Sequence, residues 1–167
     1  MSARENAVGA GIEIQATRDR VWSVWSQFGN VQDYVAGVPK SYLTGTTQQG
    51  IGTERRCEIS PKQVVDEKIT DWEDGSRYVM EVTRATGVPI GSLSADCRVR
   101  GTNGAATATI SVRYSMKGLI RFLPLRRAME RQAADHLIGL KHLVETGEAV
   151  TPQLLKSLRK RYSGSLA

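Results

Sequence analysis

Residues 107–146 read TATISVRYSMKGLIRFLPLRRAMERQAADHLIGLKHLVET, and this stretch decides the fold. Up to Met116 polar and apolar residues alternate, which is typical of a β-strand with one buried face. From about residue 119 to 146 the apolar residues recur at helical spacing, and Gly147 is a natural C-cap. Pro124 either lies in the first turn of this helix or separates a Leu119–Leu123 turn from it. The stretch predicts a strand followed directly by one long amphipathic helix.

More strands precede this helix. A period of two runs through residues 37–116, and pairs such as Asp74-Gly75 and Asn103-Gly104 predict turns between strands. One polar face and one apolar face indicate an antiparallel sheet with one side covered. Glu67 and Asp71 have the same parity in this alternation, so we expect both side chains on the concave face of the sheet.

The N-terminal part predicts one strand and two short helices. Residues 12–16 alternate as a strand does, and Thr17 is a plausible N-cap for a helix that ends at Gly29. Asn30 with Asp33 resembles a capping box for a second helix through residue 35.

Size and composition indicate one globular domain. The chain has 167 residues, of which 40% are hydrophobic and 24% charged. We expect a single domain over 1–147 and a basic C-terminal extension over 148–167 that forms a short helix. No window is apolar enough to span a membrane, and the first residues lack the apolar core of a secretory signal, so we expect a cytoplasmic protein.

The net charge of +6 is unevenly distributed. Lys and Arg balance Asp and Glu up to residue 116, and residues 117–167 carry the whole excess. This C-terminal part of the chain is either a solvated helix face with a basic tail or a surface that attracts an anionic membrane or an acidic partner. With few aromatic residues free for base stacking, we expect no nucleic acid.

Motifs for metals, nucleotides and nucleophilic catalysis are absent from the sequence. His136 and His142 are six positions apart, which is wrong for two ligands on one helix face, and there is no cysteine cluster. Cys57 and Cys97 lie on separate predicted strands and are interpreted as buried free thiols. We expect no metal and no cofactor.

The order of elements resembles the helix-grip fold of the START-like, Bet v 1-like or SRPBCC superfamily, and within it the polyketide cyclase/dehydrase and lipid-transport group. The likeness covers about residues 8–147 and rests on the opening strand, Arg20-Val21-Trp22, residues 50–55, residues 66–69 and Tyr78. It implies an α+β fold in which a curved antiparallel sheet of about seven strands, two short helices and a long C-terminal helix enclose a cavity. It also implies a mouth framed by residues 60–63, 87–91 and 117–127, with Pro61, Val88, Pro89 and Arg126 at its edge.

Together, the parity and the resemblance predict an apolar cavity wall, although the interior could instead be filled by side chains. The predicted wall residues are Cys57, Ile59, Met80, Ala95, Cys97, Ile110, Val112, Phe122, Met129 and Ala133.

Four inward polar residues are the candidates for ligand anchoring or catalysis: Arg55, Glu67, Tyr78 and Tyr114. A buried charge needs a partner, so we expect Arg55 and Glu67 to pair across neighbouring strands, at the rim of the barrel if the pair is structural. His136 lies one position off the helix stripe and could border the cavity; it is interpreted as a boundary residue and not as a proton carrier.

Two functions follow as hypotheses. The first is binding or transport of a hydrophobic small molecule, such as a lipid, an isoprenoid or a polyketide-like compound. The alternative is a polyketide cyclase or aromatase that uses the same cavity to fold a flexible chain. The sequence names neither the ligand nor the oligomeric state.

Overall fold

The computed structural model describes residues 5–101 and 104–167. The predicted turn at Asn103-Gly104 lies partly outside them, because Asn103 is not among the described residues. The elements in chain order are β1 (Asn6–Ile14), α1 (Arg18–Trp25), η1 (Phe28–Asp33), β2 (Lys40–Leu43), β3 (Glu54–Ser60), β4 (Gln63–Glu73), β5 (Arg77–Thr86), β6 (Ile90–Gly101), β7 (Ala106–Met116), η2 (Gly118–Phe122), α2 (Arg126–Thr146) and α3 (Pro152–Tyr162).

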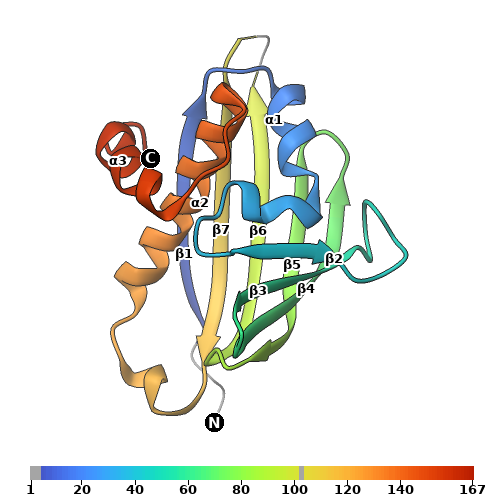
Figure 1. Cartoon of the computed structure of the whole chain (residues 1–167), viewed down its shortest axis with the longest axis vertical. Helices are drawn as coiled ribbons and strands as arrows, with labels where there is room; N and C mark the ends of the chain where they lie inside the picture. Colours follow the sequence, from blue (N-terminus) through green and yellow to red (C-terminus); the bar gives the residue numbers. More distant parts are fainter. Residues whose placement is uncertain (1–4, 102–103) are drawn as a thin grey trace.

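One antiparallel sheet forms the body of the molecule. Its seven strands lie in the order β1-β7-β6-β5-β4-β3-β2, so β2 to β7 form a meander and β1 pairs with β7. The long helix α2 crosses one face of the sheet over β1 and β7, and α1 and η1 lie toward one end of the same face (Figure 1). This arrangement confirms the predicted α+β helix-grip fold.

The helix α3 packs mainly on α2. Arg159 Nη2 lies 2.6 Å from Asp135 Oδ2 and ties the two helices together. Beyond α3 the chain returns to β1, where Gly11 and Ala167 exchange two backbone hydrogen bonds of 2.8 Å.

The N-terminal elements differ from the prediction at their boundaries. Thr17 does cap α1, since its Oγ1 accepts a hydrogen bond from the Arg20 backbone N–H at 3.2 Å. However, α1 ends at Trp25 and not at Gly29, and the second helix is a 3₁₀ segment. The expected capping box is wrong because Asn30 itself lies inside this segment with non-helical backbone angles.

The prediction that Asp71 lies on the concave face is wrong because β4 contains a β-bulge. The register with β5 shifts between Ile69 and Asp71, and one extra residue reverses the parity beyond that point. The Asp71 side chain is therefore half exposed and pairs with Arg77. Trp72 instead packs toward the core, with its ring centroid 4.9 Å from that of Trp22.

Pro124 separates a short helical turn from the long helix, which is the second of the two predicted alternatives. The 3₁₀ segment η2 ends at Phe122, the Leu123 backbone is extended, and α2 begins at Arg126. Pro124 disfavours helical geometry in the preceding residue, which explains why the two helices are separate.

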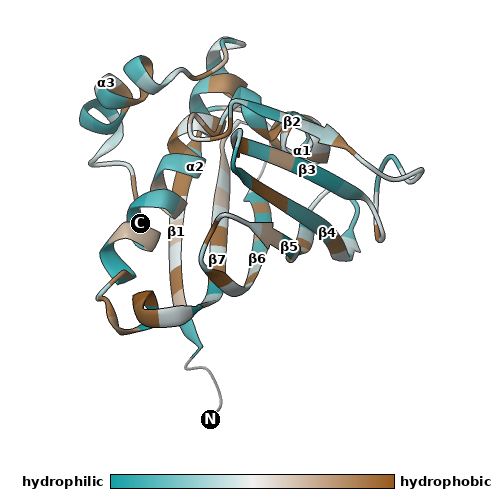
Figure 2. Cartoon of the chain, turned by 60° about the horizontal axis from the view of Figure 1, so that its bottom comes forward, coloured by the Kyte–Doolittle hydropathy of each residue, from teal (hydrophilic) through white to brown (hydrophobic). Residues whose placement is uncertain are grey.

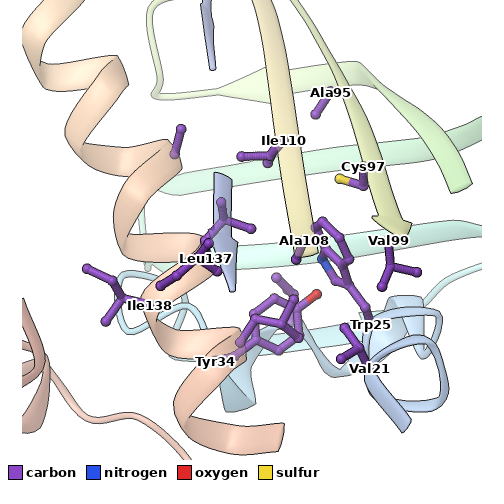
Figure 3. Close-up of a cluster of buried hydrophobic side chains, with 14 of the residues drawn as sticks. Val21, Trp25, Tyr34, Ala95, Cys97, Val99, Ala108, Ile110, Leu137 and Ile138 are labelled. Atoms are coloured by element: carbon purple, nitrogen blue, oxygen red, sulfur yellow. The ribbon is translucent and has the colours of Figure 1, made fainter. Parts of the chain in front are cut away.

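A glycine in α2 allows the N-terminal segment to lie directly against the helix. A Cβ at Gly139 would lie only 1.8 Å from the carbonyl oxygen of Tyr34. The Tyr34 ring therefore reaches into the space between α2 and the sheet, where Trp25 and Leu137 also lie (Figure 3).

Candidate ligand-binding cavity

A cavity of about 270 Å³ lies between the sheet and α2. Its volume is slightly below the range of about 300–1,000 Å³ that is usual for small-molecule sites. Aliphatic side chains from β3 to β7, α2 and the segment after η1 form most of its wall. The interior is thus hollow and mainly apolar.

Most of the predicted wall residues line this cavity. They are Cys57, Ile59, Met80, Ala95, Cys97, Ile110, Val112, Met129 and Ala133. Phe122 does not, and this part of the prediction is wrong: η2 breaks away from α2, and the Phe122 side chain is 71% exposed.

The predicted mouth residues lie at one end of the molecule, where β3, β5 and β7 end and α2 begins. Of the four, Val88 lines the cavity, whereas Pro61, Pro89 and Arg126 do not. The Pro89 carbonyl accepts a hydrogen bond from the Lys117 backbone N–H at 2.9 Å and so fixes one side of this end. Arg126 points away and pairs with Glu130, with Nε 2.8 Å from Oε1.

A buried ion pair forms the polar part of the wall. Arg55 on β3 and Glu67 on β4 are register partners, and Arg55 Nε lies 2.5 Å from Glu67 Oε2. The two residues are only 3% and 8% exposed, so the pair lies inside the cavity and not at the rim that the sequence suggested. Arg55 also donates to the Phe28 carbonyl at 2.9 Å, and its guanidinium lies 3.9 Å from the centre of the Phe28 ring. Burial lowers the Arg55 pKa, but the Glu67 charge, together with Cys57, Tyr34 and Tyr78, raises the pKa above its ordinary value.

Neutral hydrogen-bonding groups surround this pair. Burial raises the pKa of both Cys57 and Cys97 to about 12, with the Glu67 charge adding to the shift of Cys57. Burial also raises the pKa of Tyr78 and of Tyr34 well above the ordinary value of a phenol. Both thiols and both phenols are therefore protonated at neutral pH.

His136 completes the polar wall from the side of α2. Its Nε2 accepts a hydrogen bond from Trp25 Nε1 at 3.0 Å, and its ring packs edge-on against Tyr34. Burial, followed by the Arg55 charge, lowers the His136 pKa to about 3, so the ring is neutral. Because Nε2 is the acceptor, the proton lies on Nδ1, and His136 carries an N–H donor in the cavity wall.

Sequence reasoning placed His136 near the cavity but did not anticipate its hydrogen bond with Trp25, and it assigned no role to Tyr34. The Tyr34 hydroxyl is buried and has no hydrogen-bond partner among the described residues. Tertiary packing brings both residues close enough for the Arg55 charge to affect their pKa values, which no local pattern reports. Tyr114 was predicted to be a cavity residue and is not one. It is buried in the core, as its parity predicts, but it does not line the cavity.

Further wall residues alternate along the strands in step with the predicted ones but were not predicted to line the cavity. Val65 and Val82 are examples on β4 and β5, and Leu93 and Met116 are examples on β6 and β7. Alternation alone cannot separate a side chain that borders a cavity from one that packs against a neighbour.

The described residues include no cluster of three or more side chains suited to a metal ion. None of their helices is both long and apolar enough to cross a bilayer.

Comparison with known proteins agrees with this geometry. Residues 7–145 match the model of the family described as polyketide cyclase / dehydrase and lipid transport, and the chain belongs to this family. No curated protein matches the chain.

Solved structures share the fold at low sequence identity. An uncharacterised protein from Bacillus thuringiensis superimposes with a TM-score of 0.70 at 16% identity, covering 84% of this chain and 99% of its own. The protein XoxI from Bacillus cereus gives the same score and identity, with 84% and 96% covered. Ara h 8.0201 gives a TM-score of 0.68 at 13% identity, with 86% and 99% covered.

Proposed function

We propose that this protein binds a hydrophobic small molecule in the cavity between sheet and α2. The observation that carries the proposal is an apolar hollow of about 270 Å³ with a polar group in its wall. Burial of apolar ligand surface at about 25 cal/mol per Å² supplies affinity, and the few polar groups select the ligand.

The polar wall favours a ligand that carries an acceptor oxygen. Tyr78 is a protonated phenol, the neutral His136 ring carries an N–H on Nδ1, and Arg55 is already held by Glu67 and the Phe28 carbonyl. A carbonyl or hydroxyl oxygen placed beside these donors could accept hydrogen bonds that an entirely apolar ligand could not. A ligand carboxylate is less suitable because it would lie close to the Glu67 carboxylate.

The cavity volume limits the size of the ligand. A hollow of this size suits a single ring system or a short chain, and it is too small for a two-chain phospholipid without expansion. We therefore favour an isoprenoid or polyketide-like molecule over a membrane lipid as the bound species.

Native mass spectrometry of the purified protein tests this proposal. We expect an adduct that is released on collisional activation, and denaturing analysis of the released molecule should show a neutral apolar compound with oxygen. A protein that purifies empty and then fails to bind a panel of apolar ketones and alcohols would contradict the proposal.

A cyclase-type enzyme is the second candidate, and the buried Arg55–Glu67 pair in the cavity wall favours it. Catalysis would here depend on fixed donors that polarise a carbonyl and on proximity within the cavity. The pKa values of Tyr78, His136 and both thiols lie far from neutrality, so none of these groups is suited to exchange protons at pH 7. We therefore rank binding first. Turnover of a poly-β-ketone by the wild type, lost in Glu67→Gln and Tyr78→Phe, would reverse this order.

A further inference from the structure

The segment between β7 and α2 exposes large apolar side chains that nothing in the described chain covers. Leu119 is 84% exposed, Phe122 71% and Leu123 56%. They belong to η2 and the residue after it, the apolar segment at one end of the molecule (Figure 2). Most of the large hydrophobic residues that the structure describes as exposed gather here, which marks the segment as a contact surface.

Basic residues flank these side chains. Lys117, Arg121 and Arg127 are exposed and form no salt bridge in the part of the chain that the structure describes. The Arg121 guanidinium lies 4.7 Å from the centre of the Phe122 ring, so charge and apolar surface are directly adjacent. The neighbouring acidic residue Glu130 is already paired with Arg126.

This segment also borders the cavity. Met116 immediately precedes it and Met129 follows it in the first turn of α2, and both side chains line the cavity. The backbone bond from Lys117 to Pro89 holds it beside the loop whose Val88 lines the same hollow. A partner that contacts η2 would therefore lie at the cavity mouth.

We propose that residues 117–127 form a docking surface for an anionic lipid bilayer. Exposed leucine and phenylalanine side chains can enter the boundary between headgroups and acyl chains, while lysine and arginine contact anionic headgroups. Nucleic acid would use the basic residues but would leave the leucines in water. This surface is separate from the cavity interior, so the proposal goes beyond ligand binding and can fail independently of it.

Vesicle co-sedimentation tests the proposal. We expect the protein to sediment with phosphatidylcholine vesicles that contain phosphatidylserine and to remain in solution with phosphatidylcholine alone. Lys117→Ala/Arg121→Ala should weaken this binding about ten-fold or more, and Leu119→Ser/Phe122→Ser should weaken it similarly. These residues are exposed, so the melting temperature should not change.

The basic helix α3 offers a matched control. Lys156→Ala/Lys160→Ala removes the same charge from exposed positions far from η2 in the sequence, and it should leave vesicle binding within about two-fold. An equal loss in this control would attribute binding to net charge alone and overturn the docking surface. Absent binding, equal binding to both vesicle types, or an unaffected Leu119→Ser/Phe122→Ser variant would also overturn it.

Discussion

Arg55 and Glu67 face each other across β3 and β4 with Nε and Oε2 2.5 Å apart, and both are buried in the wall of an otherwise apolar cavity. Removing one partner leaves a buried charge without compensation, which costs about 3–5 kcal/mol. We expect Glu67→Gln to lower the free energy of unfolding by roughly the lower value, because the amide keeps one hydrogen bond to Arg55. Urea denaturation measures this loss.

The double variant Arg55→Met/Glu67→Leu is the control. It replaces both charges by apolar side chains, and we expect it to recover most of the lost stability. If Glu67→Gln unfolds like the wild type, or if the double variant is as unstable as the single one, Arg55 and Glu67 do not form a buried ion pair.

The partly buried His136 ring makes stability depend on pH. Its pKa is about 3 in the folded protein against about 6.5 in the unfolded chain, so below neutrality the unfolded state binds a proton that the folded state does not. Stability therefore falls as the pH falls through 6.5, by about 2 kcal/mol between pH 7.5 and pH 5. His136→Gln, which keeps an acceptor for Trp25 Nε1, should remove this part of the slope. If the free energy of unfolding of the wild type and of His136→Gln depends equally on pH between pH 7.5 and pH 5, His136 is not neutral in the folded protein.

We expect the substitution Gly139→Ala to destabilise the protein, although helix propensity alone predicts the reverse. Alanine is normally better than glycine inside a helix by about 1 kcal/mol. At this position, however, the new methyl group would lie 1.8 Å from the Tyr34 carbonyl oxygen and would force η1 away from α2. We expect Gly139→Ala to destabilise the protein by about 1–3 kcal/mol in urea denaturation.

The matched control is Gly37→Ala, where an added Cβ meets nothing within 4 Å. It should change the free energy of unfolding by less than about 0.5 kcal/mol. A neutral or stabilising Gly139→Ala would show that the two segments are not in close contact.

The sequence predicted the sheet and the ion pair because both depend on alternation. Parity within β3 and β4 placed Arg55 and Glu67 on one face, and the short loop between the strands made them neighbours. The same parity failed at Asp71, since a bulge inserts a residue that no composition pattern reveals.

The helical side of the site was less predictable. Phe122 fits the helical stripe, but Pro124 separates it from α2 and turns it into the exposed surface at the mouth. Trp25 and His136 are 111 positions apart in the chain, and only the tertiary packing of α1 on α2 brings their nitrogens together. A hollow interior likewise depends on how closely α2 approaches the sheet, which the sequence constrains only through small residues such as Ala133.

Titration with 6-propionyl-2-(dimethylamino)naphthalene, a neutral fluorescent ketone with a single ring system, tests the hollow itself most directly. Ala133 is buried and lines the cavity, so Ala133→Phe should fill part of the space, whereas Ala128→Phe adds the same ring on the exposed side of α2. We predict saturable binding of one probe per wild-type chain, unchanged binding by Ala128→Phe, and binding at least about ten-fold weaker by Ala133→Phe. Binding that does not saturate, or that Ala133→Phe leaves intact, would contradict an internal ligand site.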